Sequence, residues 1–413
     1  MVKSLSNRAA CILRAWLWGV VISLLAMLAV SCSKEDDPVP PVQKNGERSV
    51  LVYMVANNSL GGSIPPGKDE PGYDNADIGE MLYAAANGAL GGNRLIVYHH
   101  AYRKPPVLKE ITSGGIKELK TYETSESSVS ASRMLQVLED FKSEAPAEKY
   151  GIVLWSHANG WIQNGMPENL EQIRPKAFGE DLFDGRRVYM NVTTLARVLA
   201  GQGFDYVYFD CCHMAGVEVA YQLRYVTPFI VGSASELPAQ GMPYDKTLPY
   251  LMADEADPVG AAAQTFAYYD GLTGWGRTCT ISVIDTSELD ALADAVGEFY
   301  SLHPQLSADY RGQKFIASRC RYFDLSHYLG GLAQADMGGG FMTAYANALS
   351  AIDKAVVFER ATPYLWYGLP EQVDINNHCG LSTYIMKSEQ DADADRLNYR
   401  NLDWWKHVAS RLW

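Results

Sequence analysis

The sequence predicts an α/β fold built on a mostly parallel sheet with helices on both faces. Dense runs of apolar, β-branched and aromatic residues alternate with segments of helical spacing from about residue 48 to about residue 235. These runs are nearly continuous instead of alternating in polarity, as expected for strands buried on both faces. Reactive or polar residues follow directly after three of them, where parallel sheets bind their ligands.

Five apolar runs are predicted to form the core strands of the sheet. They are residues 49–56, 94–99, 150–155, 206–209 and 228–232. A segment with helical spacing lies between each consecutive pair: 78–86, 127–141, 193–199 and 215–223. Asn191 or Thr193 is suited to cap the third of these helices. Because parallel neighbours need a crossover, usually a helix, this alternation favours a parallel sheet.

The pattern weakens beyond residue 245. A strand is predicted at 280–284, a helix at 289–302, helical material at 322–329 and 341–358, and a late strand at 380–386. No repeat, low-complexity segment or clear linker interrupts this part. The simplest interpretation is one domain, residues 48–413, that ends in a helical C-terminal extension.

The N-terminus has the order of charges and apolar residues that is typical of a secretion signal. An apolar run at 16–30 follows three positive residues, Lys3, Arg8 and Arg14. A spanning helix needs about 20 apolar residues, so an uncleaved anchor helix is the less favoured alternative.

Cys32 makes this interpretation more specific. Residues 28–32 (LAVSC) resemble a bacterial lipobox, in which the cysteine becomes the lipidated first residue. We therefore expect residues 1–31 to be a lipoprotein signal peptide and residues 32–47 to be an acidic, proline-rich tether. Acyl chains on Cys32 would attach the exported protein to the outer membrane or the cell surface without a spanning helix.

Composition excludes some classes of function. The chain of 413 residues has a formal net charge of -13 and no basic cluster, which argues against a nucleic-acid partner. Of its seven cysteines, five lie beyond Cys32, and none of these five has the paired spacing of a zinc site. We expect no metal ligands from these cysteines, and a chain of this length needs no disulfide scaffold.

His157 and Cys212 are the candidate reactive pair. Each follows a predicted buried strand, and His157 lies 55 residues before Cys212, which leaves room for one helical crossover. Neighbouring parallel strands bring their exit loops together. A thiolate is the nucleophile of cysteine chemistry, and an adjacent imidazole activates it.

The sequence around both residues resembles the clostripain family of cysteine peptidases. Residues 154–161 (LWSHANGW) are similar to the histidine motif of that family, usually LWDHGGGW, and residues 209–214 (FDCCHM) to its nucleophile motif, FDACLM. Further matches are residues 50–58, 217–221 and 233–244, with weaker ones at 380–382 and 399–404. The resemblance implies a caspase-like three-layer sandwich and an endopeptidase that cleaves peptides after Arg or Lys through a Cys-His dyad.

The resemblance also assigns roles to single residues. It selects Cys212 over Cys211, which stands where the family has alanine, and makes His213 an unfavoured rival base. Because adjacent strand residues point to opposite faces, one of the two thiols is expected in the core. The backbone N–H groups of Ala158 and Cys212 are the expected oxyanion donors.

Acidic residues are the candidates for reading a basic side chain of the substrate. Asp210 lies two residues before Cys212 and so on the same face of the strand, where its carboxylate could pair with Arg or Lys. Its alternative role is a strand-end carboxylate bonded to nearby backbone N–H groups. Ser233 and Glu236, in the matched segment after the fifth strand, are further substrate-binding candidates, although a solvated loop acid is the plain alternative for Glu236.

Maturation and cofactors are implied only by the resemblance. Relatives often mature by cleavage between the two motifs, which makes Lys176 the candidate processing site and the pair 186–187 a second one. No cofactor is required by the sequence. Calcium stimulates some relatives, but the chain has no EF-hand spacing.

Departures from the family pattern leave other functions open. Ser156 replaces the usual aspartate, and Ala158 and Asn159 replace two glycines, which would cost strain if positive φ is needed there. A catalytically degenerate lipoprotein with a binding or structural role is therefore the main alternative. A hydrolase that acts on a non-peptide amide is the third.

Overall fold

The computed structural model describes residues 46–62, 72–161, 178–302, 312–315, 322–335, 339–366, 372–386 and 398–412. The predicted signal peptide 1–31, the lipidation site Cys32, most of the tether and the processing candidate Lys176 lie outside these residues. No helix within the described ranges combines the length and the apolar character needed to cross a bilayer.

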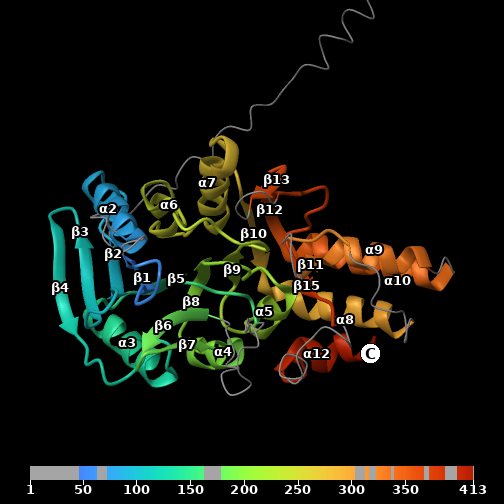
Figure 1. The fold of residues 1–413 in the computed structure, drawn as a ribbon, viewed down its shortest axis with the longest axis horizontal. Coiled ribbons are helices and arrows are strands. Elements are labelled where there is room, and N and C mark those ends of the chain that lie inside the picture. The colour runs from blue at the N-terminus through green and yellow to red at the C-terminus, as the bar shows by residue number, and fades with distance from the viewer. Residues whose placement is uncertain are drawn as a thin grey trace, which may run out of the picture. The chain divides into compact units, whose positions relative to one another are not determined.

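A nine-stranded sheet forms the centre of the described chain (Figure 1). Its strand order is β12-β10-β9-β8-β5-β1-β2-β3-β4. The bounds are β1 Arg48–Val55, β2 Arg94–His100, β3 Val107–Thr112, β4 Gly115–Thr121, β5 Lys149–Trp155, β8 Phe204–Asp210, β9 Phe229–Gly232, β10 Thr280–Asp285 and β12 Val356–Ala361. The five strands from β9 to β2 are parallel, and the two strands added at each edge are antiparallel to their neighbours.

Alternate residues of the central strands pack into two separate cores. In β1, Leu51 and Tyr53 belong to one core and Val50 and Val52 to the other. Every residue of β1 is buried, which explains its continuous apolar run. The predicted three-layer arrangement with helices on both faces is confirmed.

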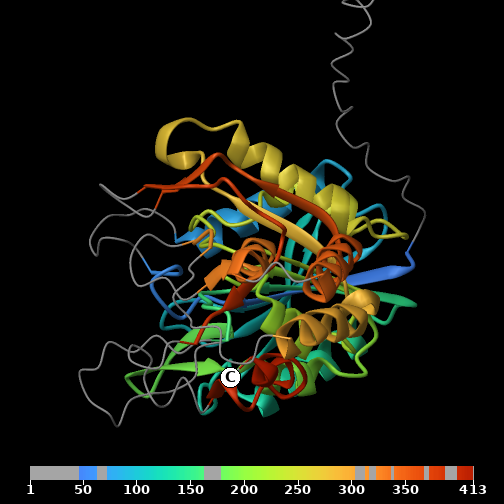
Figure 2. The same cartoon turned by 90° about the vertical axis from the view of Figure 1, so that its right-hand side faces the viewer.

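Helices cover both faces of this sheet. One face carries α2 (Tyr73–Ala86), α6 (Tyr244–Leu251) and α7 (Pro258–Asp270). The other core contains α3 (Ala131–Glu144), α4 (Val192–Leu199), α5 (Val217–Gln222), α8 (Leu289–Ser301), α9 (Leu325–Ala335) and α10 (Gly339–Ala355). Figures 1 and 2 show α7 in yellow on the opposite side of the sheet from α12 (Asp403–His407) in red.

Capping residues fix where two of the predicted helices begin. Ser130 accepts a hydrogen bond from the backbone of Arg133, so α3 starts later than predicted and runs on to Glu144. Asn191 caps α4 through the backbone of Thr194, which settles the choice between Asn191 and Thr193.

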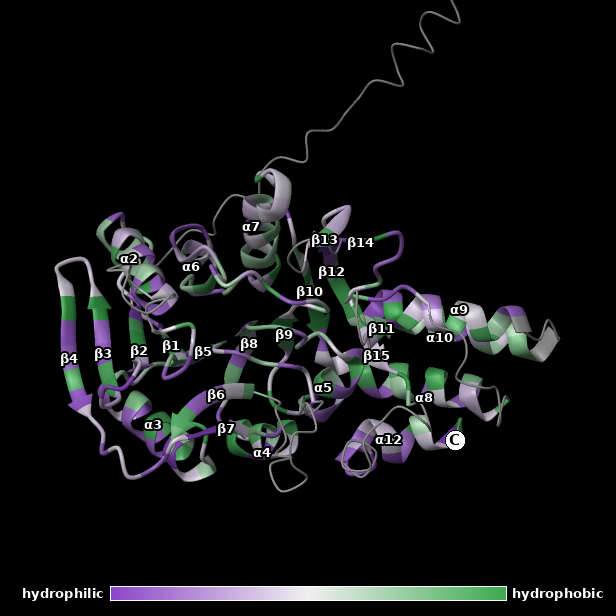
Figure 3. Cartoon of the chain, viewed as in Figure 1, coloured by the Kyte–Doolittle hydropathy of each residue, from purple (hydrophilic) through white to green (hydrophobic). Residues whose placement is uncertain are grey.

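Two hairpins were missed by the sequence prediction. β3 and β4 form one edge of the large sheet, and each contains both hydrophilic and hydrophobic residues (Figure 3). β6 (Phe178–Phe183) and β7 (Arg186–Met190) form a separate two-stranded sheet. Edge strands carry fewer buried residues than core strands, so their apolar pattern is weaker. Helices α6 and α7 were also missed, although Asp257 and Pro258 are an N-cap followed by a proline at the first helical position.

The C-terminal part is mixed, which corrects the predicted helical extension. The predicted helix 341–358 ends at Ala355, and β12 follows at once and joins the large sheet. The predicted helical segment 322–329 begins with β11 (Tyr322–Asp324), which pairs with β15 (Ser382–Tyr384). A third short pair joins β13 (Tyr364–Trp366) to β14 (Gln372–Asp374).

Candidate active site

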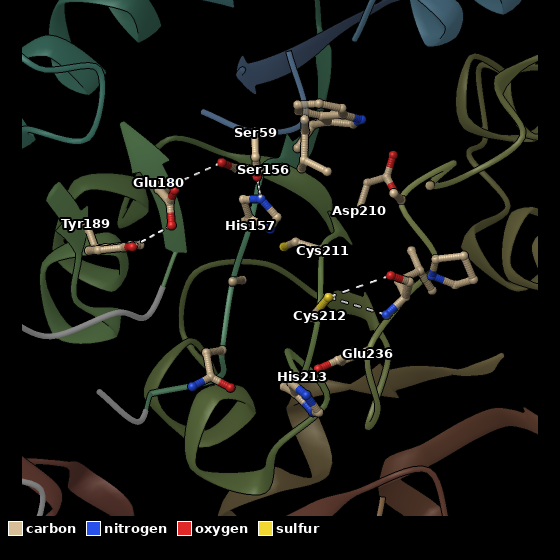
Figure 4. Close-up of a pocket in the computed structure, with 18 of the residues that line it drawn as sticks. Ser59, Ser156, His157, Glu180, Tyr189, Asp210, Cys211, Cys212, His213 and Glu236 are labelled. Atoms are coloured by element: carbon tan, nitrogen blue, oxygen red, sulfur yellow. Dashed lines mark hydrogen bonds between the residues drawn. The ribbon is translucent and has the colours of Figure 1, made fainter. Parts of the chain in front are cut away.

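β5 and β8 bring the two candidate reactive residues to the same edge of the sheet. The strands are parallel neighbours, and Trp155 pairs with Asp210 in register. His157 and Cys212 therefore each lie two residues beyond a paired position. Both line one cavity of about 530 Å³, together with Ser59, Glu180, Asp210 and Glu236. Figure 4 shows these residues around the cavity.

The Cys212 thiol lies half-buried against the loop after β9. The backbone N–H of Leu237 donates to Cys212 Sγ at 3.4 Å, and the thiol donates to the carbonyl of Leu237 at 3.7 Å. Burial raises the pKa of this thiol to about 12, and the nearby carboxyl of Glu236 adds to the effect. The thiol is therefore protonated in this state, so any nucleophilic role needs a base.

The rivals of this pair, Cys211 and His213, also line the cavity, but their reactive groups have other partners. Cys211 is buried, and its thiol donates to the carbonyl of Leu154 at 3.6 Å, as expected for the thiol that faces the core. The His213 ring is buried, bonds the carbonyl of Ala234 through Nδ1 at 3.1 Å and stacks on Tyr322. Burial lowers the pKa of His213 to about 4, which makes it a weak base.

His157 lies in a loop that several polar groups hold. Ser59 Oγ lies 2.9 Å from His157 Nε2, and the backbone of Gly179 donates to the carbonyl of His157 at 3.0 Å. Ser156, directly before it, donates to the carbonyl of Val55 at 2.8 Å and accepts from the backbone of Glu180 at 3.0 Å. The loop is thereby tied to both β1 and β6.

Asp210 is buried next to the cavity as a satisfied hydrogen-bond acceptor. It accepts from the backbone of Met242 at 2.9 Å and from the hydroxyl of Tyr244 at 3.0 Å. Gly241 has φ +64, and a Cβ there would lie 2.8 Å from the carboxylate, so only glycine lets this loop close over Asp210. Burial raises the pKa of Asp210 to about 7, with a further contribution from the charge of Glu80.

Two acids behind Asp210 escaped the sequence prediction. Asp77 accepts from the indole N–H of Trp155 at 2.6 Å, and Glu80 accepts from the backbone of Tyr244 at 2.8 Å. Burial raises the pKa of both carboxyls, and that of Asp77 is raised further by Asp210. Their three-residue spacing on the buried side of α2 was the available signal.

The structure separates the two remaining substrate-binding candidates. Glu236 lines the rim of the cavity, and partial burial raises the pKa of its carboxyl. Ser233 does not line the cavity. It is fully buried, with Oγ 2.8 Å from Thr280 Oγ1 and 3.2 Å from Ser235 Oγ. Its placement corrects the sequence-based prediction, because this serine supports the loop after β9.

The β6–β7 hairpin contributes cavity residues that the sequence did not indicate. Glu180, Arg187 and Tyr189 line the cavity, and Glu180 accepts from the hydroxyl of Tyr189. Arg187 Nε lies 3.4 Å from Glu180 Oε1. These residues are far from both motifs in the sequence, and the hairpin itself was not predicted.

A model of the clostripain family, peptidase family C11, matches residues 52–393. The chain belongs to the clostripain family. No curated protein matches the sequence.

Solved structures agree with the family assignment. An inactive zymogen C11 protease from Parabacteroides distasonis is 25% identical, with a TM-score of 0.71 over 89% of this chain and 99% of that one. A secreted C11 cysteine protease from Bacteroides thetaiotaomicron, in complex with an irreversible peptide inhibitor, is 27% identical, with a TM-score of 0.70 over 88% and 99%. The caspase-like fold is thus confirmed, and the chain is a cysteine-type peptidase.

The chain lacks two glycines of the family's histidine motif and keeps the third. Ala158 and Asn159, which replace two clostripain glycines, do not have positive φ, so the strain considered for them is absent. Gly160, which is retained, has φ +59, and a Cβ there would lie 2.3 Å from the hydroxyl of Tyr322. The glycine that the backbone needs is the one that this clostripain relative keeps.

Free thiols are found at all four cysteines within the described ranges: Cys211, Cys212, Cys279 and Cys379. Among the described residues, no group of three or more His, Cys, Asp or Glu side chains is arranged to hold a metal ion.

Proposed function

We propose that this clostripain-family chain is an endopeptidase that cleaves after Arg or Lys, with Cys212 as nucleophile and His157 as base. The observation that carries the proposal is the common cavity at the ends of β5 and β8. The two residues reach it from adjacent strands of a buried sheet, so their separation is set by the core of the fold.

The proposed reaction uses protein groups only. His157 takes the proton of the Cys212 thiol, and the thiolate attacks the scissile carbonyl carbon. The backbone N–H groups of Ala158 and Cys212 stabilise the oxyanion. The C–N bond then breaks, and the leaving amine takes the proton from His157. Water hydrolyses the thioester, which releases the acid and restores the thiol.

Acidic residues around the cavity support the proposed specificity for a basic side chain. Glu180, Asp210 and Glu236 line it, and Asp210 lies beside the nucleophile. An ionised carboxylate pairs strongly with a guanidinium or ammonium group. Such a pair would compensate Asp210 for part of the hydration that it loses on burial.

The proposed location and maturation follow from the sequence. We infer export by the signal at 1–31, lipidation at Cys32 and attachment to the outer membrane or cell surface. One similar structure is described as a secreted protease, which supports export. Cleavage at Lys176 remains the proposed maturation step.

Hydrolysis of fluorogenic peptides by the full chain tests the proposal. Peptidyl-Arg and peptidyl-Lys aminomethylcoumarins should be cleaved much faster than peptidyl-Leu or peptidyl-Glu analogues. Cys212→Ala should abolish cleavage, whereas the adjacent control Cys211→Ala should retain it. An arginyl chloromethyl ketone should label wild type and Cys211→Ala but not Cys212→Ala. Equal cleavage by Cys212→Ala, or an unlabelled and inactive wild type, would contradict the proposal.

A further inference from the structure

We propose that Ser59 is a positioning residue for His157, an inference that rests on the proposed function. Ser59 Oγ lies 2.9 Å from His157 Nε2, and Ser59 lines the same cavity as Cys212. Figure 4 shows the serine and the imidazole joined by this contact. Since the two residues are 98 positions apart in the sequence, only the fold brings them together.

The loop that carries Ser59 is fixed by the two asparagines before it. Asn58 is buried and donates to the carbonyls of Val55 at 2.9 Å and Glu180 at 2.7 Å, and it accepts from the backbone of Leu60 at 2.8 Å. This side chain uses its donors and its acceptor to connect β1, β6 and its own loop.

Asn57 adds a second anchor. Its amide donates to Asp181 at 2.8 Å and to the carbonyl of Leu182 at 2.9 Å, and its oxygen accepts from the backbone of Arg103 at 2.8 Å. Ser59 itself is exposed, but two buried and fully bonded side chains precede it. Its position is therefore set by the framework and does not depend on the contact with His157.

The His157 loop is tied to the same framework. The backbone N–H of Gly179 donates to the carbonyl of His157. The backbone of Glu180 donates to Ser156 Oγ and accepts from the side chain of Asn58. Both the loop of Ser59 and the loop of His157 are therefore hydrogen-bonded to β6, which fixes the distance between the serine and the imidazole. Such an arrangement holds a ring orientation before substrate arrives, which is what a base needs.

The role proposed for Ser59 requires one tautomer of the imidazole, the one with its proton on Nε2. If Ser59 Oγ accepts the Nε2 proton, the lone pair lies on Nδ1, which then takes the proton from Cys212 Sγ. The Nε2 proton stays in place throughout, and its hydrogen bond to Ser59 strengthens when the ring becomes positive. The Nδ1 proton then passes to the leaving amine as the C–N bond breaks.

Two variants of the same shape measure the effect of the Ser59 hydroxyl alone. Ser59→Thr keeps it, and Ser59→Val places a methyl group there in the same volume. In the full chain, Ser59→Val should lower kcat about 10-fold with KM unchanged, while Ser59→Thr stays within about 3-fold of wild type. The apparent pKa of the imidazolium in the kcat–pH profile should fall in Ser59→Val only, because the charged ring loses its acceptor. Equal melting temperatures of both variants are expected.

The possible results separate this inference from the proposed function. Equal kcat in Ser59→Val and Ser59→Thr, or a higher kcat in Ser59→Val, would overturn the Ser59 assignment; the higher value would mean that the serine blocks the ring. An active wild type with an inactive Cys212→Ala and a fully active Ser59→Val removes only the Ser59 assignment. Undiminished cleavage by Cys212→Ala, or an inactive wild type, overturns the proposed function and this inference with it.

Discussion

The two walls of the cavity are built in different ways. On the thiol wall, at the end of β8, buried groups are held mainly by backbone partners: Leu237 for Cys212 and Met242 for Asp210. On the imidazole wall, at the end of β5, side chains of Ser59, Asn58 and Ser156 connect three elements. Burial shifts the pKa values of the thiol wall, whereas directional hydrogen bonds set the geometry of the imidazole wall.

Because of this difference, we expect the two walls to have different roles in catalysis. The thiol wall controls protonation, since removal from water raises the pKa of both Cys212 and Asp210. The imidazole wall controls orientation, because its groups are held by polar contacts between separate elements. Changes to the first wall should alter the ionisation of Cys212 and Asp210 and with it the substrate specificity, and changes to the second should alter turnover.

Removal of the imidazole should have the largest effect and tests whether the two walls have separate roles. His157→Ala should lower kcat/KM about 10²- to 10⁴-fold, because the buried thiol loses its base. The same variant should still be alkylated at Cys212 by iodoacetamide, at a rate that rises with pH toward a thiol pKa of about 12. A thiol that titrates near pH 8.5 in His157→Ala would show that burial does not set its pKa.

Asp210→Asn tests the thiol wall's role in specificity. The amide oxygen can still accept from the backbone of Met242, and the amide N–H₂ can donate to the hydroxyl oxygen of Tyr244, but the charge is gone. Cleavage after Arg and Lys should fall about 100-fold, because a charged partner in the substrate would be left unpaired. Alkylation of Cys212 by uncharged iodoacetamide should not become slower, because the charge of Asp210 raises the pKa of that thiol. An unchanged ratio of Arg to Leu cleavage would remove Asp210 from the specificity pocket.

Burial pattern explains how much of the fold was predictable. The core strands could be predicted because they are covered on both faces, so β1 is apolar at every position from Val50 to Val55. β4 faces solvent at most positions and gave no comparable run. The sequence prediction extended the preceding helix into β12, because no glycine or proline marks the boundary between Ala355 and Val356.

The same limit applied to the site. His157, Asp210 and Cys212 could be predicted because they directly follow or end buried strands. Asp77 and Ser59 reach the site through contacts between segments far apart in the chain, which no local pattern encodes. Ser233 fits the same strand-end rule as the dyad but turns into the core, so the rule finds the edge of the sheet and not the direction of each side chain.

The pH dependence of specificity sharpens the comparison further. Asp210 should ionise near pH 7, so cleavage after Arg relative to Leu should rise about 10-fold per pH unit below 7 and level off above it. The ratio cancels every effect of pH that is the same for both substrates. The ionisable neighbours that interact with this carboxyl are Glu80, Asp77, Tyr244, Cys212, Cys211, Tyr208 and Tyr269.

Glu80→Gln is the matched variant for this pH profile. It keeps an acceptor for the backbone of Tyr244 and removes the negative charge that raises the pKa of Asp210. The profile should therefore move to lower pH. The stability of the folded protein without substrate should change with pH in the opposite direction to the specificity. Because the pKa of Asp210 is raised in the folded state, its contribution to stability is present below about pH 4 and is lost as the pH rises through 7. A flat Arg-to-Leu ratio between pH 5 and 8 would contradict this account.

Ser156→Ala gives the smallest effect and tests the imidazole wall. It leaves the buried N–H of Glu180 and the carbonyl of Val55 without this hydroxyl, which should cost about 1–3 kcal/mol of unfolding free energy in urea. Ser282→Ala is the matched control, because that buried hydroxyl donates to the carbonyl of Gly380 away from the cavity. Both variants should lose stability, but only Ser156→Ala should lower kcat, by about 10-fold or less, since only this serine fixes the loop that carries the base. Equal kcat in the two variants would mean that the β5 loop keeps its geometry without Ser156, and that orientation on this wall depends on fewer contacts than the structure shows.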